Sequence, residues 1–371
     1  MHWTAVTLPS YGPPHGSRPP AVPTANRPAV IGERTVIPPI FVGIGGDSGS
    51  GKSTLVSAFH DLLGAERITT ICLDDYHSLD RRERALLGLT PLNPRANNFA
   101  LMEEQLWALK RGEPIAKPVY DHSDGTFRPP ERVDPNEVVI IQGLHPFLLP
   151  GIREAFDLKV WLDPEPQLRI RWKLQRDVAK RGYDETQVRA EIEARRADAE
   201  AHIRPQRAWA DMVVRFSSPA RGPAPGNTDH LNVRLTQRHS IPQLAFEHGL
   251  HNGHTVRLHN DITDEDGRRS DVIEIDGGIS VDDAARIEQA VWDHASERHH
   301  HLHRLRQREL GSYDEPRGRR HSDPLGLTQL ILAHRILSAQ KSLLVRMRAD
   351  DYAAISHHLA PARVSLTETR E

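Results

Sequence analysis

Short apolar runs alternate with helix-like segments through the first half of this chain. Mainly apolar or β-branched runs, typical of buried strands in a parallel sheet, lie at residues 40–44, 68–73, 138–141, 158–163 and 212–216. Segments with the composition or the three-and-four spacing of helices lie at residues 54–63, 100–109, 165–181 and 185–200. Strands that alternate with helices predict an α/β fold, with a mostly parallel sheet flanked by helices.

The rest of the chain is expected to add a tail at each end and a C-terminal α+β extension. Further strands are expected at 231–235 and 271–275, and helices at 282–306 and around 327–337. Proline-rich residues 1–37 predict a disordered tail, with a targeting segment as the alternative. The expected organisation is a tail at 1–37, a core domain at 38–216, a linker at 217–230, the extension at 231–345 and a tail at 346–371.

Composition limits the cellular location and the binding partners that are expected for this chain. The 371 residues carry a formal charge of −2, which gives no general argument for binding nucleic acid or an anionic membrane. No apolar run approaches the length of a membrane span. Cys72 is the only cysteine, so an internal disulfide is excluded and a reducing, cytoplasmic location is expected. The histidine run at 299–303 lacks a metal-ligand pattern and predicts a solvated patch.

The strongest motif follows the first apolar run. The spacing G-x-x-x-x-G-K-[S/T] of a phosphate-binding loop (P-loop) is matched, with one flanking residue, by Gly46, Asp47, Ser48, Gly49, Ser50, Gly51, Lys52, Ser53 and Thr54. Glycines let backbone N–H groups point at phosphate oxygens, Lys52 adds a positive charge, and the Ser53 hydroxyl can reach a magnesium ion. Strand, loop and helix follow in the order that places phosphates at a helix N-terminus. A bound nucleotide is therefore predicted.

Polar residues follow the second predicted strand, where ligands of open α/β sheets lie. Asp74, His77 and Arg81 fall within eight residues. A carboxylate beside cationic side chains suits proton abstraction and anion binding. The alternative interpretation is a solvated loop that ends in an Asp helix cap.

The predicted helix at 165–181 has two sides. A packing stripe is expected from Ile170, Leu174 and Val178. The adjoining side carries a dense set of charged residues: Lys173, Arg176, Asp177, Lys180 and Arg181. Such a face suits phosphate groups, with the one acid near a metal; an ordinary solvated helix face is the alternative.

Together these segments resemble the phosphoribulokinase family. The matching stretches are Cys72–Arg81, Pro94–Phe99, Lys117–Tyr120, Gly143–Pro146 and Trp172–Asp177. The resemblance is strong over about residues 40–216 and weaker beyond, where 326–329 is similar to the final helix of the plant and cyanobacterial type. It implies a P-loop kinase fold, a homodimer, and transfer of the γ-phosphoryl group of ATP to the 1-hydroxyl of ribulose 5-phosphate.

The resemblance also implies residue roles. Asp74 would accept the hydroxyl proton, Lys52 and Lys173 would stabilise the transferring group, and Asp177 would support the metal or catalysis. The sugar phosphate would be held by His77, Arg81, Arg176 and Arg181. Magnesium would be placed by Ser53, Asp74 and Gln142. Several positions depart from the family pattern: Gln142 stands where a glutamate is usual, Ser50 stands where the plant type has a regulatory cysteine, and Asn93, Asn98 and Ala100 stand where acids are usual.

Three other functions remain open from the sequence. A related kinase would act on uridine, pantothenate or another hydroxyl acceptor, but a neutral acceptor leaves the cluster of arginines without an anionic partner. A GTP-hydrolysing switch would need an [N/T]-K-x-D motif, which is absent. A non-catalytic nucleotide sensor is favoured by Gln142.

Overall fold

The computed structural model describes residues 30–31, 34–35, 38–219, 230–239, 255–298, 310–315 and 318–358. Within these, the side chains at 30–35, 180–181, 294–298, 341 and 344–358 lie outside the description. The chain divides into two units, Met1–Val36 and Ile37–Glu371. The first contains a short antiparallel pair, β1 (Val30–Ile31) and β2 (Arg34–Thr35). The other residues of the expected N-terminal tail and the histidine run lie outside the described residues.

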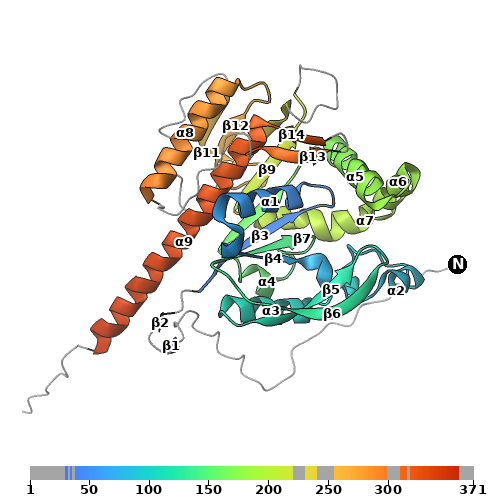
Figure 1. Ribbon diagram of the computed structural model, residues 1–371, viewed down its shortest axis with the longest axis horizontal. Coiled ribbons are helices and arrows are strands. Elements are labelled where there is room, and N and C mark those ends of the chain that lie inside the picture. Colours follow the sequence, from blue (N-terminus) through green and yellow to red (C-terminus); the bar gives the residue numbers. More distant parts are fainter. Residues whose placement is uncertain are drawn as a thin grey trace, which may run out of the picture. The chain divides into compact units, whose positions relative to one another are not determined.

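An eight-stranded sheet in the order β11-β12-β10-β9-β8-β3-β7-β4 is the centre of the second unit (Figure 1). Five strands are mutually parallel and match the five apolar runs: β3 (Ile40–Gly46), β4 (Ile68–Cys72), β7 (Val138–Gly143), β8 (Leu158–Leu162) and β9 (Met212–Ser217). The predicted mostly parallel α/β sheet is therefore confirmed.

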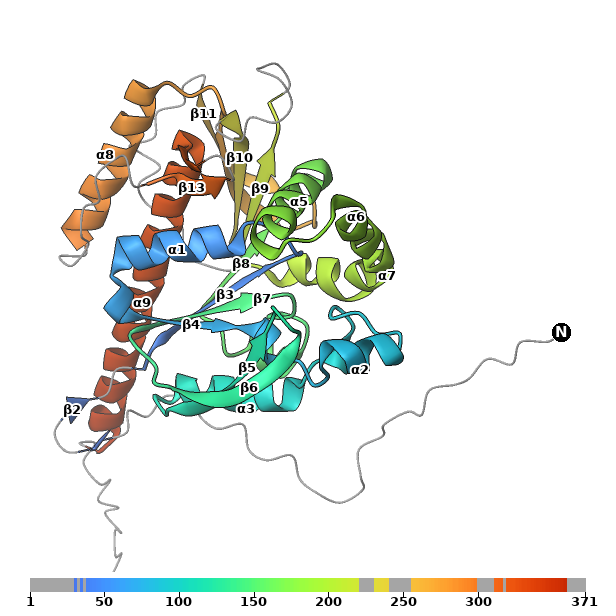
Figure 2. The same ribbon diagram turned by 45° about the vertical axis from the view of Figure 1, so that its right-hand side comes forward.

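Neighbouring residues of each central strand pack on opposite faces of this sheet, because strand side chains alternate. On β3, Ile40, Val42 and Ile44 join one core and Phe41 joins the other. The first core contains side chains of α1 (Lys52–Leu63), α8 (Val281–Arg298) and α9 (Asp323–His358). The second contains side chains of α3 (Phe99–Lys110), α4 (Pro150–Arg153) and the short helical turn at Ala199–Ile203, which the 3-10 helix Arg204–Trp209 follows. Figure 2 shows α1 and α9 together on one side and α3 on the other.

Smaller elements surround the carboxyl ends of the parallel strands. They are α2 (Arg81–Leu86), α5 (Pro166–Arg181), α6 (Glu185–Ala194), α7 (Arg196–Asp198) and the hairpin of β5 (Ile115–Asp121) and β6 (Thr126–Val133). Single turns of 3-10 helix lie at Ala65–Arg67, Leu73–Tyr76 and Pro94–Ala96. Pro129 and Pro130 lie inside β6, whose exposed two-stranded pairing tolerates missing N–H donors.

The C-terminal extension continues the central sheet. Its strands β10 (Asn232–Arg238), β12 (Arg269–Ile275) and β11 (Val256–Thr263) pair antiparallel, with β10 against β9. The sequence analysis did not predict β11, nor the hairpin of β13 (Ser312–Glu315) and β14 (Gly318–His321). Helix α9 runs to His358, so its end lies within the stretch from 346 onward that was expected to be a tail. The division into a core domain and an extension stays a prediction.

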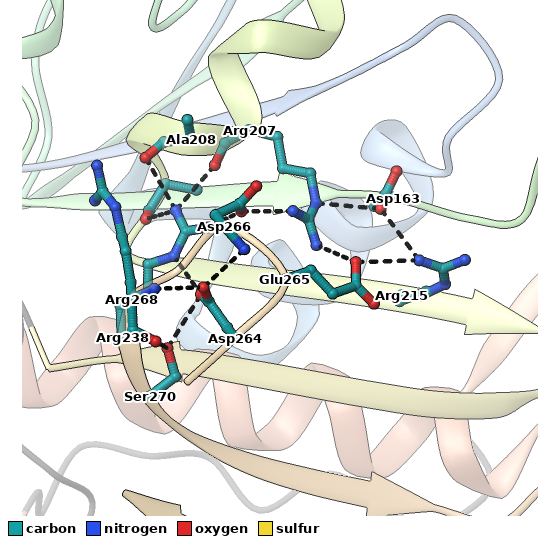
Figure 3. Close-up of polar contacts among 11 residues, drawn as sticks. Asp163, Arg207, Ala208, Arg215, Arg238, Asp264, Glu265, Asp266, Arg268 and Ser270 are labelled. Carbon is teal, nitrogen blue, oxygen red and sulfur yellow. Dashed lines mark hydrogen bonds and ion pairs between the residues drawn. The ribbon is translucent and has the colours of Figure 1, made fainter. Parts of the chain in front are cut away.

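Ion pairs fasten the turn between β11 and β12 to the sheet (Figure 3). The guanidinium group of Arg238 is 1% exposed, and it donates to the carboxylates of Asp264 and Asp266 and to three backbone carbonyls near the end of the 3-10 helix at Arg204–Trp209. Arg207 from that helix reaches Asp163, Glu265 and Asp266. The network joins residues before β9 to the β11–β12 turn. It therefore connects the two halves of the sheet.

No helix within the described residues is long and apolar enough to cross a bilayer.

Candidate active site

The loop at residues 46–51 connects β3 to α1 in the way its motif predicts. Gly49 and Gly51 have φ angles of +84° and +94°, a region that favours glycine, and Gly51 is the residue that precedes α1. The ammonium group of Lys52 donates to the carbonyls of Gly46 at 2.8 Å and Asp47 at 3.0 Å. Burial lowers the pKa of Lys52 to about 8, although Asp74 and Asp47 act in the opposite direction. The Lys52 side chain thus folds back over the loop that precedes it, where phosphates would bind.

Helix α5 packs directly on this loop. A side chain at Gly49 would place its Cβ 2.8 Å from the Cβ of Lys173, so only glycine permits the approach. Arg169 donates to the carbonyl of Ser48 at 3.2 Å and forms an ion pair with Asp47 at 3.3 Å. Arg176 donates to the hydroxyl of Ser48 at 3.3 Å. Two arginines of one helix therefore hold the phosphate-binding loop.

Two charged residues of α5 are buried, whereas one residue of the expected packing stripe is exposed. Val178 is 42% exposed, whereas Lys173 and Asp177 are buried, so the packing prediction for Ile170, Leu174 and Val178 is wrong for Val178. Lys173 contacts one Asp177 oxygen at 2.5 Å, and the Nε atom of Arg176 donates to the other at 2.8 Å. Burial alone would raise the pKa of Asp177, but hydrogen bonds from Arg176 and Lys173 lower it. The spacing of residues in the sequence could not show which face of α5 is buried, since the residues of both faces recur every three to four positions.

Asp74 lies just beyond the carboxyl end of β4, among positive charges. It belongs to the 3-10 turn Leu73–Tyr76, and the Nε2 atom of His122 lies 3.8 Å from its Oδ2 atom. Burial by itself would raise the pKa of Asp74, but His77, His122, Lys52 and Arg176 together lower it below the usual value. Asp74 is therefore a carboxylate at neutral pH, within electrostatic reach of Lys52 of the phosphate-binding loop and Arg176 of α5.

The neighbouring acid, Asp75, makes contacts that hold the β5–β6 hairpin in place. One of its oxygens contacts the ammonium group of Lys117 at 2.5 Å, and the other accepts the N–H of Tyr120 at 3.0 Å. Both partners belong to β5. Asp75 therefore holds the β5–β6 hairpin against the turn that carries Asp74, and this hairpin brings His122 to the site.

His77 and Arg81 also come to this edge of the sheet. The Nδ1 atom of buried His77 is 2.9 Å from the Oδ1 atom of Asn97, and its ring meets Tyr120 edge-on with centroids 4.9 Å apart. Burial lowers the pKa of His77, against the opposing charge of Asp74. Arg81 begins α2 and donates to the backbone carbonyl of His122 at 2.5 Å. The side chain of Arg181 lies outside the described residues.

An Asp helix cap is present, but it is Asp80 and not Asp74. Asp80 accepts from the backbone of Glu83 while the Glu83 side chain accepts from the backbone of Asp80, a reciprocal cap that starts α2. The capping residue in the alternative interpretation, a solvated loop that ends in an Asp helix cap, is therefore Asp80. Asp74 is free of this capping role.

Gln142 ends β7 between the two site strands, paired with Ile44 of β3 and Cys72 of β4. Its Oε1 atom is buried with no hydrogen-bond partner in the described part of the chain. An unpaired buried oxygen is costly, and a hard cation with its waters is one partner that would satisfy it. The exposed Ser53 begins α1 beside the loop. The oxygen donors Ser53, Asp74 and Gln142 fit magnesium together with phosphates, although in the described residues no three His, Cys, Asp or Glu side chains form a metal cluster by themselves.

Three contributors were missed by the sequence analysis. His122 reaches Asp74 only because β5 and β6 form a hairpin, and Arg169 reaches the loop only through the packing of α5. Arg84 is buried, with its guanidinium group 2.6 Å from both the Tyr120 hydroxyl and the Leu79 carbonyl. His122 lies two residues beyond Tyr120, the last residue of a stretch that carries the family resemblance. Its charge beside a predicted site was the available signal.

Comparison with known proteins places this site in a family. Residues 41–220 match the model described as the phosphoribulokinase / uridine kinase family. A uridine kinase of Alkaliphilus metalliredigens is 34% identical over 154 residues, which cover 40% of this chain and 74% of that protein. The chain belongs to the phosphoribulokinase / uridine kinase family.

Within this family, phosphoribulokinases show the higher identity. The phosphoribulokinase of Synechocystis sp. is 46% identical over 214 residues, and the alignment covers 57% of this chain and 64% of that protein. The chain thus spans less than two thirds of that relative. A solved phosphoribulokinase structure from Rhodobacter spheroides aligns with a TM-score of 0.50 at 19% identity, covering 69% of this chain and 96% of that chain. At that identity the likeness shows the fold, and it confirms the P-loop kinase fold expected from the sequence.

Proposed function

We propose that the protein is a kinase that transfers the γ-phosphoryl group of ATP to the 1-hydroxyl group of ribulose 5-phosphate. The observation that carries this proposal is the position of Asp74, an ionised carboxylate surrounded by Lys52, His77, His122 and Arg176. Phosphoryl transfer depends mainly on positioning and on neutralising charge. The identities of 46% to a cyanobacterial and 37% to a plant phosphoribulokinase support this acceptor over others.

In the proposed reaction, Asp74 accepts the proton of the acceptor hydroxyl as its oxygen bonds to the γ-phosphorus. The bond from that phosphorus to the bridging oxygen breaks, and ADP leaves. Lys52 and Lys173 stabilise the transferring group, and Asp177 holds Lys173 and Arg176 in place through both carboxylate oxygens. Ser53, Asp74 and Gln142 would hold magnesium, which supplies charge neutralisation for the phosphates.

The acceptor is proposed to bind through its phosphate group to His77, Arg81, Arg176 and Arg181. An anionic acceptor gives the three arginines of this set a charged partner that uridine or pantothenate lacks, and His77 adds a hydrogen-bonding group. A homodimer and a cytoplasmic location accompany the proposal as predictions.

The proposal is tested by ADP release with ribulose 5-phosphate, uridine, pantothenate or no acceptor, each with the native protein and Asp74→Asn. Release that depends on ribulose 5-phosphate and is lost in Asp74→Asn supports it. Equal release with every acceptor, or preference for a neutral one, contradicts it. Nucleotide binding with no release under any condition favours the sensor alternative, for which the unusual Gln142 is the supporting feature.

A further inference from the structure

The two substrates of the proposed reaction meet different parts of the site. A cavity of about 500 Å³ is lined by residues 49–55 at the phosphate-binding loop and by the start of α9, and it belongs to the proposed nucleotide site. Neither Asp74 nor His77 lines this cavity. The acceptor is instead recognised by groups near Asp74, among which His77 is held by the loop at residues 90–98.

The backbone of this loop is paired with the turn that carries His77. His77 and Asn97 form an isolated antiparallel bridge. Two backbone hydrogen bonds flank the bridge, at 2.7 Å and 3.0 Å, and join residues 76–78 to residues 96–98. Both side chains are buried, and the Nδ1 atom of His77 lies 2.9 Å from the Oδ1 atom of Asn97. The backbone therefore fixes the separation of the two side chains.

The side-chain amide of Asn97 has one favourable orientation. Its Nδ2 atom donates to the carbonyl oxygens of Pro91 at 3.2 Å and Asn93 at 2.9 Å. Carbonyl oxygens only accept hydrogen bonds, and the NH₂ group supplies the two donors of the amide. If the amide were turned over, its oxygen would face two carbonyl oxygens and repel them. The Oδ1 atom of Asn97 is therefore the atom that meets His77.

This orientation decides which nitrogen of His77 carries a proton. An amide oxygen only accepts, so the Nδ1 atom beside it is the N–H donor. In a neutral imidazole the other nitrogen, Nε2, then has no proton and accepts. The Nε2 atom has no hydrogen-bond partner in the described part of the chain and, unlike both ring nitrogens of His145, is not fully buried. It is available to a ligand.

Surrounding groups hold the ring and keep it uncharged. Tyr120 meets the His77 ring edge-on with centroids 4.9 Å apart, and the guanidinium group of Arg84 donates to the Tyr120 hydroxyl at 2.6 Å. Burial lowers the pKa of His77 and Arg84 acts in the same direction, whereas Asp74 and the hydrogen bond to Asn97 oppose them without reversing the shift. The ring is therefore neutral at neutral pH.

We propose that Asn97 is a positioning residue, which fixes the proton of His77 on Nδ1 so that Nε2 accepts a hydrogen bond from a hydroxyl group of the sugar phosphate. A hydroxyl group donates, whereas a phosphate dianion presents acceptor oxygens that would repel the Nε2 lone pair. The inference rests on the proposed function. Within it, His77 contacts the sugar part of the acceptor and the phosphate group is left to the arginines.

The first test reads the tautomer in the native protein without a ligand. NMR of protein labelled with nitrogen-15 in its histidine rings distinguishes protonated from unprotonated nitrogens. The signals of His77 are those lost in both His77→Phe and His77→Asn. A protonated Nδ1 and an unprotonated Nε2 are expected at neutral pH, and Asn97→Ala is expected to populate the opposite tautomer. The opposite tautomer or a doubly protonated ring in the native protein, or an unchanged tautomer in Asn97→Ala, overturns the proposal.

The second test identifies the part of the acceptor that His77 contacts. His77→Phe keeps a ring against Tyr120, and His77→Asn keeps a donor for Asn97, but both remove Nε2. Each is expected to raise KM for ribulose 5-phosphate about tenfold, through the loss of one hydrogen bond. Competitive inhibition by inorganic phosphate is expected to change less than about twofold. Arg81→Ala is expected to weaken both, and His60→Gln, whose ring contacts Thr70, is the control that changes neither.

The outcomes separate this inference from the proposed function. Equal weakening of ribulose 5-phosphate and inorganic phosphate in the two His77 variants, with native-like melting temperatures, overturns the hydroxyl contact and places His77 on the phosphate group. An unchanged KM in both variants overturns the contact as well. Absence of ADP release by the native protein with ribulose 5-phosphate overturns the proposed function and the sugar contact, whereas the NMR measurement still decides the role of Asn97.

Discussion

The Nε2 atom of His122 lies 3.8 Å from the Oδ2 atom of Asp74, although 48 residues separate them in the chain. The pairing depends on the β5–β6 hairpin, which Asp75 and Lys117 hold against the turn that carries Asp74. Nearby positive charges lower the pKa of the half-buried Asp74, although desolvation acts to raise it. The hairpin is therefore part of the electrostatic environment of the site.

The first prediction concerns pH. Cations lower the pKa of Asp74, so the carboxylate form that accepts a proton persists into acidic solution. His122→Gln removes one of these cations, so the pKa of Asp74 rises and the acidic limb of kcat/KM moves to higher pH. The pH profile with saturating magnesium measures this. The control His60→Gln, whose ring contacts Thr70, is expected to leave the limb in place. An unmoved limb in His122→Gln would show that the pair has no electrostatic role.

The second prediction separates two adjacent acids. Asp74→Asn is expected to lower kcat by about 10²–10⁴-fold with little change in ADP affinity, because it removes the proton acceptor. Asp75→Asn is expected to lower the melting temperature, because the buried Lys117 loses one of its two charged partners and keeps only the more exposed Glu131, while most turnover remains. Steady-state kinetics and thermal melting of both variants measure this. Comparable turnover in Asp74→Asn and the native enzyme would mean that the base is misassigned.

The third prediction concerns Lys52. Lys52→Ala is expected to abolish phosphoryl transfer and to weaken ATP binding, because the movable charge over the loop is lost. Lys110→Ala, whose ammonium group contacts Asp157 away from the loop, serves as the control for loss of a lysine. Nucleotide affinity and turnover are measured for both. Native-like turnover in Lys52→Ala would exclude its role in the transition state.

The fourth prediction concerns Gln142, whose buried Oε1 atom has no partner among the described residues. Gln142→Glu replaces a neutral oxygen by a carboxylate of nearly the same size, so half-maximal activity is expected at a several-fold lower magnesium concentration. Magnesium-dependent tightening of ADP binding gives a second readout that needs no turnover. The exposed Gln187→Glu on α6 is the control. Identical magnesium requirements for the native protein and Gln142→Glu would remove Gln142 from the metal site.

The fifth prediction concerns redox chemistry. Burial and the neighbouring Asp74 raise the pKa of the Cys72 thiol to about 12, so the reactive thiolate is scarce at neutral pH. Activity is expected to be indifferent to dithiol reductants and mild oxidants, and labelling by iodoacetamide to be slow in the folded protein. Labelling after unfolding by denaturant is the positive control. A reversible oxidative loss of activity that disappears in Cys72→Ala would contradict this.

The sequence predicted the parts of this site that local chemistry determines. The P-loop spacing required glycine, lysine and serine at fixed positions, and the apolar runs identified all five parallel strands. Contacts between distant segments were not predictable in this way. Val178 has the spacing of a packing residue yet is exposed, because the neighbouring face of α5 is buried through the Lys173–Asp177 pair. The strand β11 carries mixed polar residues on a partly exposed edge, and so lacks the apolar signal of β3 or β7.

The cavity beside the P-loop is lined both by residues soon after β3 and by residues at the start of α9. A molecule that occupies it contacts a segment near the beginning and a segment near the end of the unit that contains the sheet. If either segment unfolds, the ligand loses part of its binding site and dissociates. By thermodynamic linkage, each tenfold rise in the free ligand concentration above the dissociation constant adds about 1.4 kcal/mol to the free energy of unfolding the extension. Protease sensitivity of the extension would then report on the supply of nucleotide. The rate of proteolysis within the extension is therefore expected to fall as ligand occupies the cavity.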